Sequence, residues 1–279
     1  MKRLLAILIL LVPSFCWASV LSSSVRTTRA KTAVDSVPLS SSVRHGASGG
    51  YANAWDDYWT LDGSNGLYVA DNAILRPNSD DWTIIVGFEE DNNDEDYYGI
   101  FCKGDDVTLN NAEIRAYETR VVHTFTAGTS VSGGTWQSMT VAGGEKVNTK
   151  TCALISFLWD SGSSNYELTS HVAISGEATV STGPLDKWVN NGTSTLYFGS
   201  LYSSGSTSLG LQGKLYFIAI YDGSVLTKTN AEDILAGTAE PTDFSPAFYV
   251  DFHKDVAATY ESEISGLTLT VYGTPVKGP

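Results

Sequence analysis

The densest group of ionisable side chains is an acidic run at positions 89–96, where six of eight residues carry carboxylates. Carboxylates this close repel one another unless water, salt or a bound cation offsets their charge. Calcium takes about six to eight oxygen ligands, which Asp, Asn and Glu on a loop can supply, so Asp91, Asp94 and Asp96 are candidate calcium ligands. The run lacks the Asp-x-Asp-x-Asp-Gly spacing of an EF-hand, and a solvated acidic loop is the alternative.

A second segment, 51–59, brings four aromatic rings and two carboxylates together. Sugar rings stack on aromatic faces, and carboxylates accept hydrogen bonds from sugar hydroxyls. The alternative is that these rings cover the end of a hydrophobic core, because large aromatic side chains are mostly buried. The candidate ligand-binding residues are Trp55, Asp56, Asp57 and Tyr58, with a second set on expected loops or strand ends at Trp136, Trp188 and Tyr202.

Catalytic patterns are weaker. The spacing Glu89-x-Asp91-x-x-Asp94 is similar to that of retaining glycosidases, which need two carboxyl groups about 5 to 5.5 Å apart. The polar residues around it predict a loop rather than a rigid strand. Residues 46–50 match Gly-x-Ser-x-Gly but lack the strand-then-helix setting of a nucleophile elbow, and turns explain these glycines. The chain has no Cys-x-x-Cys or His-Glu-x-x-His pattern. We therefore predict no catalytic residues.

Residues 1–18 have the features of a cleaved signal peptide: a basic start, a short apolar run and a small-x-small cleavage site. The apolar run is shorter than the about 20 residues that span a membrane. We expect a mature protein that is secreted, to the extracellular space or the periplasm, without membrane insertion. In such an oxidising compartment Cys102 and Cys152 are candidates for a disulfide, and two separate buried thiols are the alternative.

The formal net charge of the chain is −14, which argues against nucleic acid or anionic lipid as a partner. The exception is a basic arm at 19–50, rich in Ser and Thr, in which Leu-Ser-Ser-Ser-Val-Arg occurs twice. Composition indicates a flexible linker. The alternative is an arm that docks on a neighbouring copy and causes self-association.

The elements that must position these side chains read as strands. The chain has 26 Gly, 14 Tyr and 7 Trp but only 2 Met, which is typical of aromatic strands joined by turns. One short helix is expected after Asp222-Gly223, with Thr229 or Asn230 as its N-cap and Gly237 past its end. Apolar or alternating segments predict strands at 82–88, 154–159, 215–221, 248–252 and 267–272.

Several of these segments, in this order, resemble laminin G-like (LamG) domains of the concanavalin A-like lectin/glucanase superfamily. The similar pieces are Leu-Asp-Gly at 61–63 with Leu-Tyr-Val at 67–69, the strands at 82–88, 100–104 and 154–160, and the strand, turn and helix at 196–237. The resemblance covers roughly 52 to 275. It implies an all-β fold, a two-sheet antiparallel jelly-roll sandwich with one short helix, formed by a single domain at 51–279.

The resemblance implies a non-catalytic, lectin-like protein that binds carbohydrate or another surface ligand, with a glycan or a cell-surface or matrix protein as partner and calcium as a candidate cofactor. A structural or adhesive subunit of a cell-surface or virion assembly is the alternative. A polysaccharide-degrading hydrolase or lyase of the same fold is less favoured, because the lyase residues are not reproduced by Arg115, Tyr117, Arg120 and His123.

Overall fold

The computed structural model describes residues 53–91, 97–103, 114–119, 124–131, 135–142, 147–187, 193–203, 206–208 and 210–278. All of them belong to the unit 51–279. The predicted signal peptide at 1–18 and the predicted basic arm at 19–50 lie outside the described residues.

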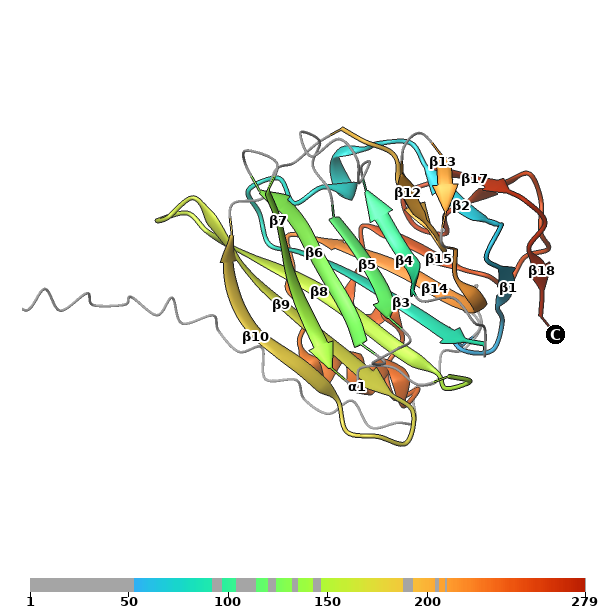
Figure 1. The fold of residues 1–279 in the computed structure, drawn as a ribbon, viewed down its shortest axis with the longest axis horizontal. Helices are drawn as coiled ribbons and strands as arrows, with labels where there is room; N and C mark the ends of the chain where they lie inside the picture. The colour runs from blue at the N-terminus through green and yellow to red at the C-terminus, as the bar shows by residue number, and fades with distance from the viewer. Residues whose placement is uncertain are drawn as a thin grey trace, which may run out of the picture. The chain divides into compact units, whose positions relative to one another are not determined.

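The described strands form two large antiparallel sheets that pack face to face, as the predicted jelly-roll sandwich requires (Figure 1). Sheet A has the order β10-β9-β8-β3-β14-β1-β18, and β15 also pairs with β14. Its strands are β1 (Trp59–Asp62), β3 (Trp82–Glu90), β8 (Thr151–Asp160), β9 (Asn165–Ile174), β10 (Val180–Lys187), β14 (Gln212–Asp222), β15 (Phe248–Asp251) and β18 (Val276–Lys277).

Sheet B has the order β16-β17-β2-β11-β4-β5-β6-β7. Its strands are β2 (Gly66–Val69), β4 (Tyr97–Lys103), β5 (Ile114–Thr119), β6 (Thr124–Val131), β7 (Thr135–Ala142), β11 (Leu196–Phe198), β16 (Thr259–Glu261) and β17 (Thr268–Tyr272). A small hairpin, β12 (Leu201–Ser203) and β13 (Ser206–Ser208), lies against β4 and β11. Three short helical elements complete the described chain: η1 (Ala73–Leu75), α1 (Lys228–Leu235) and η2 (Pro241–Phe244).

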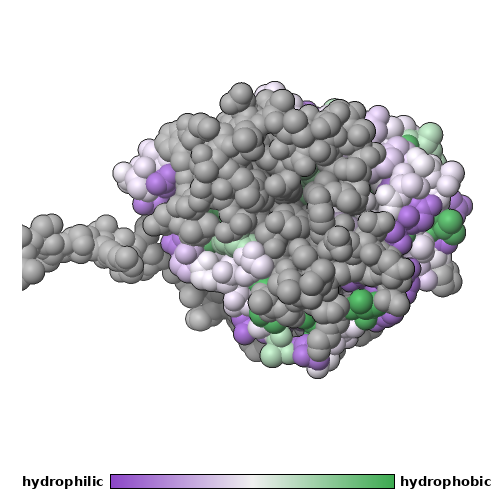
Figure 2. Space-filling view, viewed as in Figure 1, coloured by the Kyte–Doolittle hydropathy of each residue, from purple (hydrophilic) through white to green (hydrophobic). Residues whose placement is uncertain are grey.

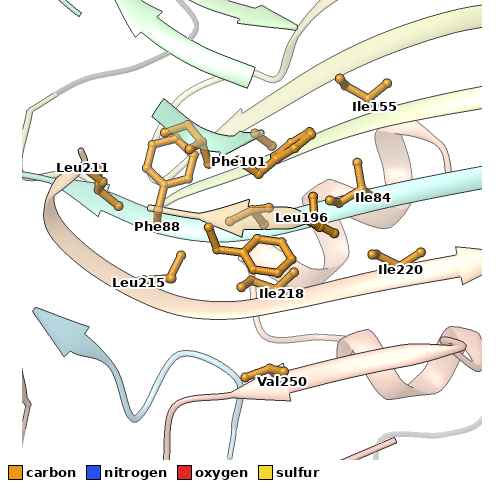
Figure 3. Packing of buried hydrophobic residues seen from close by; sticks show 14 of the residues in the cluster. Ile84, Phe88, Phe101, Ile155, Leu196, Leu211, Leu215, Ile218, Ile220 and Val250 are labelled. Carbon is orange, nitrogen blue, oxygen red and sulfur yellow. The ribbon is translucent and has the colours of Figure 1, made fainter. Parts of the chain in front are cut away.

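The hydrophobic core lies between the two sheets. Alternate residues of each strand point inward, so β3 contributes Ile84 and Phe88 while β4 contributes Phe101 from the opposite sheet (Figure 3). The segments predicted as the main apolar strands are β3, β8 and β14, which are neighbours in sheet A. The sequence therefore predicted both the strands and their role in the core correctly.

Sheet A is also covered on its outer face, where a second apolar cluster packs under α1. Ile85, Leu154 and Phe217 point outward from β3, β8 and β14, and meet Ile234 of the helix. A bulge at Tyr216 shifts the alternation of β14, so that both Tyr216 and Phe217 join this outer cluster. Burial on both faces explains why the β14 sequence has no polar face.

Helix α1 begins earlier than predicted. Its N-cap is Thr227, whose backbone N–H donates to Asn230 Oδ1 at 2.8 Å. The prediction of Thr229 or Asn230 as the cap was wrong, because Asn230 acts from the third helical position by reaching back to the cap. Gly237 follows the helix with a φ of +67°, as expected for a helix end.

The predicted disulfide is also wrong. Cys102 and Cys152 are both buried and are not joined. Cys102 lies on β4 of sheet B, whereas the side chain of Cys152 points from β8 into the cluster under α1, away from sheet B. A disulfide needs Cβ atoms about 3.8 Å apart, which side chains directed away from each other do not reach.

Where described residues are visible in Figure 2, hydrophobic ones form separate spots among hydrophilic ones. Among the residues whose burial is described, the exposed large hydrophobic side chains are Leu158 and Val276. Within the residues searched, none of the helices has the length and apolar character needed to cross a bilayer.

The contact between β3 and β14 gives a test of this packing. A Cβ placed on Gly87 would lie 2.2 Å from the Phe217 ring, whereas one on Gly183 of β10 would meet nothing within 4 Å. We expect Gly87→Ala to lower the free energy of unfolding by about 1–3 kcal/mol through overpacking. Urea denaturation measures this. Gly183→Ala is the matched control, and equal stability of both variants would contradict the packing described.

Candidate functional site

The candidate site is a row of three tyrosines on the outer face of sheet B, which we call the tyrosine row: Tyr68, Tyr197 and Tyr272. Each lies on a different strand, and the strands β17, β2 and β11 are consecutive in the sheet. The residues on either side of Tyr68 and Tyr197 point into the core, so alternation directs these two rings outward. All three side chains are partly exposed.

The rings lie close enough to form one aromatic surface. Tyr68 and Tyr197 are directly paired across the strands, with ring centroids 5.7 Å apart. Tyr272 stacks on the other side of Tyr68 at 6.5 Å, with the ring planes 29° apart. A Cβ on Gly66 would lie 2.5 Å from Tyr272 Oη. The absence of a side chain at Gly66 therefore makes room for the Tyr272 ring. The Tyr272 hydroxyl donates to Ser200 Oγ, which limits the rotation of the ring.

Hydroxyl groups surround these rings. Thr270 lies beside Tyr68 in the register of β17 and β2, and Thr259 lies beside Thr270 on β16. The backbone of Tyr202, a predicted ligand-binding residue, lies in β12, which contacts the β11 strand that carries Tyr197. This part of sheet B therefore combines aromatic faces with donors and acceptors of hydrogen bonds.

A buried ion pair supports the strands of the tyrosine row from inside. Lys103 on β4 has a side chain only 2% exposed, and its Nζ lies 2.7 Å from both Asp71 Oδ1 and the carbonyl oxygen of Ser194. Arg76 binds the other oxygen of Asp71. The contacts of Lys103 connect three parts of the chain: strand β4, the segment after β2 that contains Asp71, and the residues before β11 that include Ser194. Loss of Asp71 would leave the Lys103 ammonium buried without its charged partner.

The pKa values of this pair reflect burial and charge together. Burial alone would raise the pKa of Asp71, but hydrogen bonds from Arg76 and Lys103 outweigh it and hold the pKa below its ordinary value. Burial lowers the pKa of Lys103, and the hydrogen bond with Asp71 opposes this shift without cancelling it. The lowered pKa keeps Asp71 ionised at neutral pH.

Trp55, the central residue of the predicted aromatic site, is part of the core instead. Its side chain belongs to the cluster under α1, and the residue is only 6% exposed. Its indole N–H donates to the carbonyl oxygen of Ile234 at 2.8 Å, and its ring packs on Tyr216 and Phe217 at 5.1 Å. The prediction that Trp55 stacks on a sugar is wrong, and the alternative, that the rings cover the core, is observed.

The other described side chains of the predicted ligand-binding set, Asp56, Asp57 and Tyr58, directly follow Trp55. Tyr58 is partly exposed but packs on Tyr216, with centroids 5.4 Å apart and Lys214 over its ring. Asp56 is exposed, and the carboxylate of Asp57 lies 3.9 Å from Lys277. Trp188 lies outside the described residues, and Trp136 and Tyr202 are described only as backbone positions of β7 and β12. Trp55 and Tyr58 therefore both pack on Tyr216, and the described side chains of the set do not present an exposed aromatic face.

The acidic run starts within a strand, not a loop. Glu89 and Glu90 are the last two residues of β3, and both are buried. Glu89 forms an ion pair with Lys214 at 2.5 Å and accepts a hydrogen bond from the Tyr216 hydroxyl at 3.0 Å. The prediction of a loop from Glu89 onward is therefore wrong, because pairing with β14 outweighs the repulsion between carboxylates. Asp91 follows the strand, whereas Asp94 and Asp96 lie outside the described residues.

The Glu89 environment is that of a structural ion pair. The hydrogen bond with Glu89 raises the pKa of Lys214, although burial works against it. Burial, and then the hydrogen bond and charge of Glu89, raise the pKa of Tyr216. The side chains of the residues weighed for a lyase, Arg115 and Tyr117 among them, lie outside what the structure describes.

The sequence analysis missed the tyrosine row as a site. The sequence patterns place Tyr68 and Tyr197 only within expected strands. The available signal was a tyrosine between two inward-pointing apolar residues on each strand, which predicts an outward ring. The adjacency of strands from positions 66, 196 and 268 was not predictable from that signal.

No protein-family model matches this chain, and no curated protein matches it. Among solved structures, the chain is similar to the Ruminococcus gnavus IT-sialidase CBM40 bound to alpha2,3 sialyllactose, with 11% identity and a TM-score of 0.43 over 67% of this chain and 100% of that chain. It is also similar to the native heptameric SAP-like pentraxin from Limulus polyphemus, with 12% identity and a TM-score of 0.47 over 79% of this chain and 96% of that chain.

A third similar structure is the leech intramolecular trans-sialidase, with 13% identity and a TM-score of 0.42 over 66% of this chain and 28% of that chain. The jelly-roll sandwich implied by the sequence resemblance is observed in this chain, and its assignment to laminin G-like domains stays a prediction. These likenesses are distant.

The Asp71–Lys103 pair provides a test of how the tyrosine row is supported. We expect Asp71→Asn to lower the free energy of unfolding at pH 7 by about 3 kcal/mol, because it leaves the Lys103 ammonium buried without its partner. In the wild type, this contribution is present above the ordinary Asp pKa of 3.8 and is lost as the pH falls through the lowered pKa of the folded state.

Chemical denaturation at pH 7 and at several acidic values measures both effects. The difference between Asp71→Asn and the wild type should shrink as the pH falls. Asp56→Asn removes the same charge at an exposed position and is the control. An Asp71→Asn variant as stable as the control at pH 7 would exclude the support described.

Proposed function

We propose that this protein is a non-catalytic carbohydrate-binding protein and that the tyrosine row is its glycan-binding surface. The observation that carries the proposal is the three partly exposed rings of Tyr68, Tyr197 and Tyr272, which lie side by side on the outer face of sheet B. The proposal replaces the aromatic segment predicted from sequence, since Trp55 is buried.

The chemistry of the row suits a sugar better than a fully apolar ligand. A pyranose has C–H groups that pack on an aromatic face and hydroxyls that need hydrogen-bond partners at the rim. Tyrosine supplies the ring and a polar tip, and the hydroxyls of Thr259 and Thr270 lie in register beside the rings. A row of rings along successive strands suits an extended chain of sugar units, one unit on each ring.

The charge of the protein favours neutral glycans. The chain has a formal net charge of −14, which repels acidic polysaccharides at low ionic strength. The proposal therefore places uncharged oligosaccharides ahead of sialylated or sulfated ones.

We include two further predictions in this proposal: that the protein is secreted, and that the acidic run binds calcium. The signal peptide predicted at 1–18 supports secretion, where extracellular glycans are available. Calcium at Asp91, Asp94 and Asp96 stays a prediction for the acidic run, and binding assays with and without a chelator test it.

Substitution of the central ring tests the proposal. If one sugar covers roughly a quarter of the 150–250 Å² that an aromatic side chain can bury, at about 25 cal/mol per Å², the loss is about 1 kcal/mol, or about fivefold to tenfold in affinity. We expect Tyr68→Ala to weaken binding by at least this factor. A glycan array that contains neutral and sialylated oligosaccharides, followed by titration calorimetry on the best ligand, measures the effect.

Tyr58→Ala is the matched control, because Tyr58 is also partly exposed and belongs to the set predicted from sequence. Tyr68→Phe keeps the ring and should retain most of the binding. If Tyr58→Ala abolishes binding while Tyr68→Ala does not, the site lies on the outer face of sheet A and the proposal fails. Absence of binding by the wild type to every glycan would refute the function itself.

A further inference from the structure

Three side chains at the end of β15 offer ligand atoms to a metal ion: Asp251, His253 and Glu263. Their ligand atoms all lie within 4.8 Å of one another. His253 Nδ1 contacts Asp251 Oδ1 directly and lies 3.8 Å from Glu263 Oε1. This cluster is far in the sequence from the acidic run and was not predicted from it.

Backbone hydrogen bonds hold the cluster in place. Glu263 is fixed beside β15 because its N–H donates to the carbonyl oxygen of Tyr249 at 3.0 Å. In return, the N–H of Asp251 donates to Glu263 Oε2 at 3.3 Å. The Tyr260 hydroxyl donates to Glu263 Oε1 at 2.9 Å and to the carbonyl oxygen of Asp251. The two carboxylates are therefore positioned before any ion arrives.

The charges of the cluster are poorly compensated. The side chains of Asp251 and Glu263 are only 5% and 4% exposed. In the described part of the chain, no hydrogen-bond donor reaches Asp251 Oδ2, although this oxygen is buried. The ammonium of Lys254, 3.2 Å from Glu263 Oε1, belongs to a side chain that is 48% exposed. Buried carboxylates are costly unless they are paired or coordinate a metal.

We propose that Asp251, His253 and Glu263 bind a divalent transition-metal ion of the zinc type. One imidazole nitrogen and two carboxylate oxygens suit Zn²⁺, which binds three protein ligands and keeps a water in open sites. Calcium fits poorly, because it takes about six to eight oxygen ligands. His253, 35% exposed, opens the cluster to solvent, where a water can complete the coordination.

The spacing of the donor atoms fits such an ion with small movements. Zinc lies about 2.0–2.1 Å from its ligands in a tetrahedral arrangement, so its donor atoms are about 3.3 Å apart. The distance from His253 Nδ1 to Glu263 Oε1 is 3.8 Å, and no pair in the cluster exceeds 4.8 Å. An ion with two positive charges would also neutralise the two carboxylates.

The surrounding contacts indicate what the ion would do. The Trp59 indole donates to the carbonyl oxygen of Lys254 at 3.1 Å, and Lys277 binds the carbonyl oxygen of His253. Trp59 also packs on Tyr260, with ring centroids 5.4 Å apart. A bound ion would tie the end of β15 to the turn before β17, next to β1 and β18. Its role is to fasten these late segments to the sheets, and it does not depend on glycan binding.

Metal titration of the full chain without a polyhistidine tag tests this site. After treatment with a chelator, the wild type should bind Zn²⁺ in calorimetry, and Co²⁺ should give visible absorption bands that report nitrogen and oxygen ligands. We expect His253→Ala to lose these bands and to weaken zinc binding beyond the about 10–100-fold that removal of an outer hydrogen-bond partner costs. Zinc should raise the melting temperature of the wild type but not of His253→Ala.

Charge-matched variants separate coordination from general electrostatics. Glu263→Gln should weaken zinc binding, whereas Glu261→Gln and Asp255→Asn remove the same charge at exposed positions nearby and should not. Lys254→Gln should strengthen zinc binding about threefold to tenfold, because it removes a competing positive charge. A gain of affinity cannot come from misfolding.

Three results would overturn the site: no zinc binding by the wild type, unchanged binding by His253→Ala, or equal losses in Glu263→Gln and the two controls. Calcium binding at this cluster without zinc binding would also overturn the assignment. Binding that survives in His253→Ala would have to come from other residues, such as the acidic run.

Discussion

Strand β14 is packed on both faces, and most of the sandwich is arranged around that constraint. Leu215, Ile218 and Ile220 face sheet B, whereas Phe217 and Ala219 face the helix side. A strand with two apolar faces needs two layers of cover, and here sheet B provides one and α1 with the segment at 53–58 provides the other. The aromatic segment that resembles a sugar site is used for this cover.

This division explains where a ligand can bind. The middle of sheet A is occupied on its outer side by α1 and Trp55, so its aromatic residues are held in the core. The tyrosine row, in contrast, lies outside a sheet whose inner face alone joins the main core. The buried Asp71–Lys103 pair lies beneath the same strands and holds them in register from within. The two sheets therefore differ: sheet A is covered on both faces, whereas the outer face of sheet B carries the tyrosine row, which we propose as the recognition surface.

One side of β14 in sheet A is shared by two short strands. Strands β1 and β15 both pair with β14, one after the other along its length, so that Trp59 at the start of β1 and Asp251 at the end of β15 pair with nearby positions of β14. Polar groups gather at such a junction because the ladder of hydrogen bonds is interrupted there. Asp251, His253 and Glu263 lie at this point, where a cross-link by an ion would stabilise segments that are otherwise held at a sheet edge.

The sequence by itself determined the class of fold and the main strands. Alternation and apolar runs at 82–88, 154–159 and 215–221 predicted β3, β8 and β14, because side-chain direction in a strand is a local property with period two. The helix was predicted too, although its cap was misplaced by two or three residues, since capping depends on a side chain that reaches back along the chain.

Only the tertiary structure decided which aromatic residues are available to a ligand. Trp55 and Tyr68 both follow patterns that allow exposure, but burial depends on which distant segment packs on each ring. The same holds for the tyrosine row, whose members come from three distant parts of the chain, and for Cys102 and Cys152, which point into different layers. Pairing between distant strands is set by the packing of the whole core, and no local pattern encodes it.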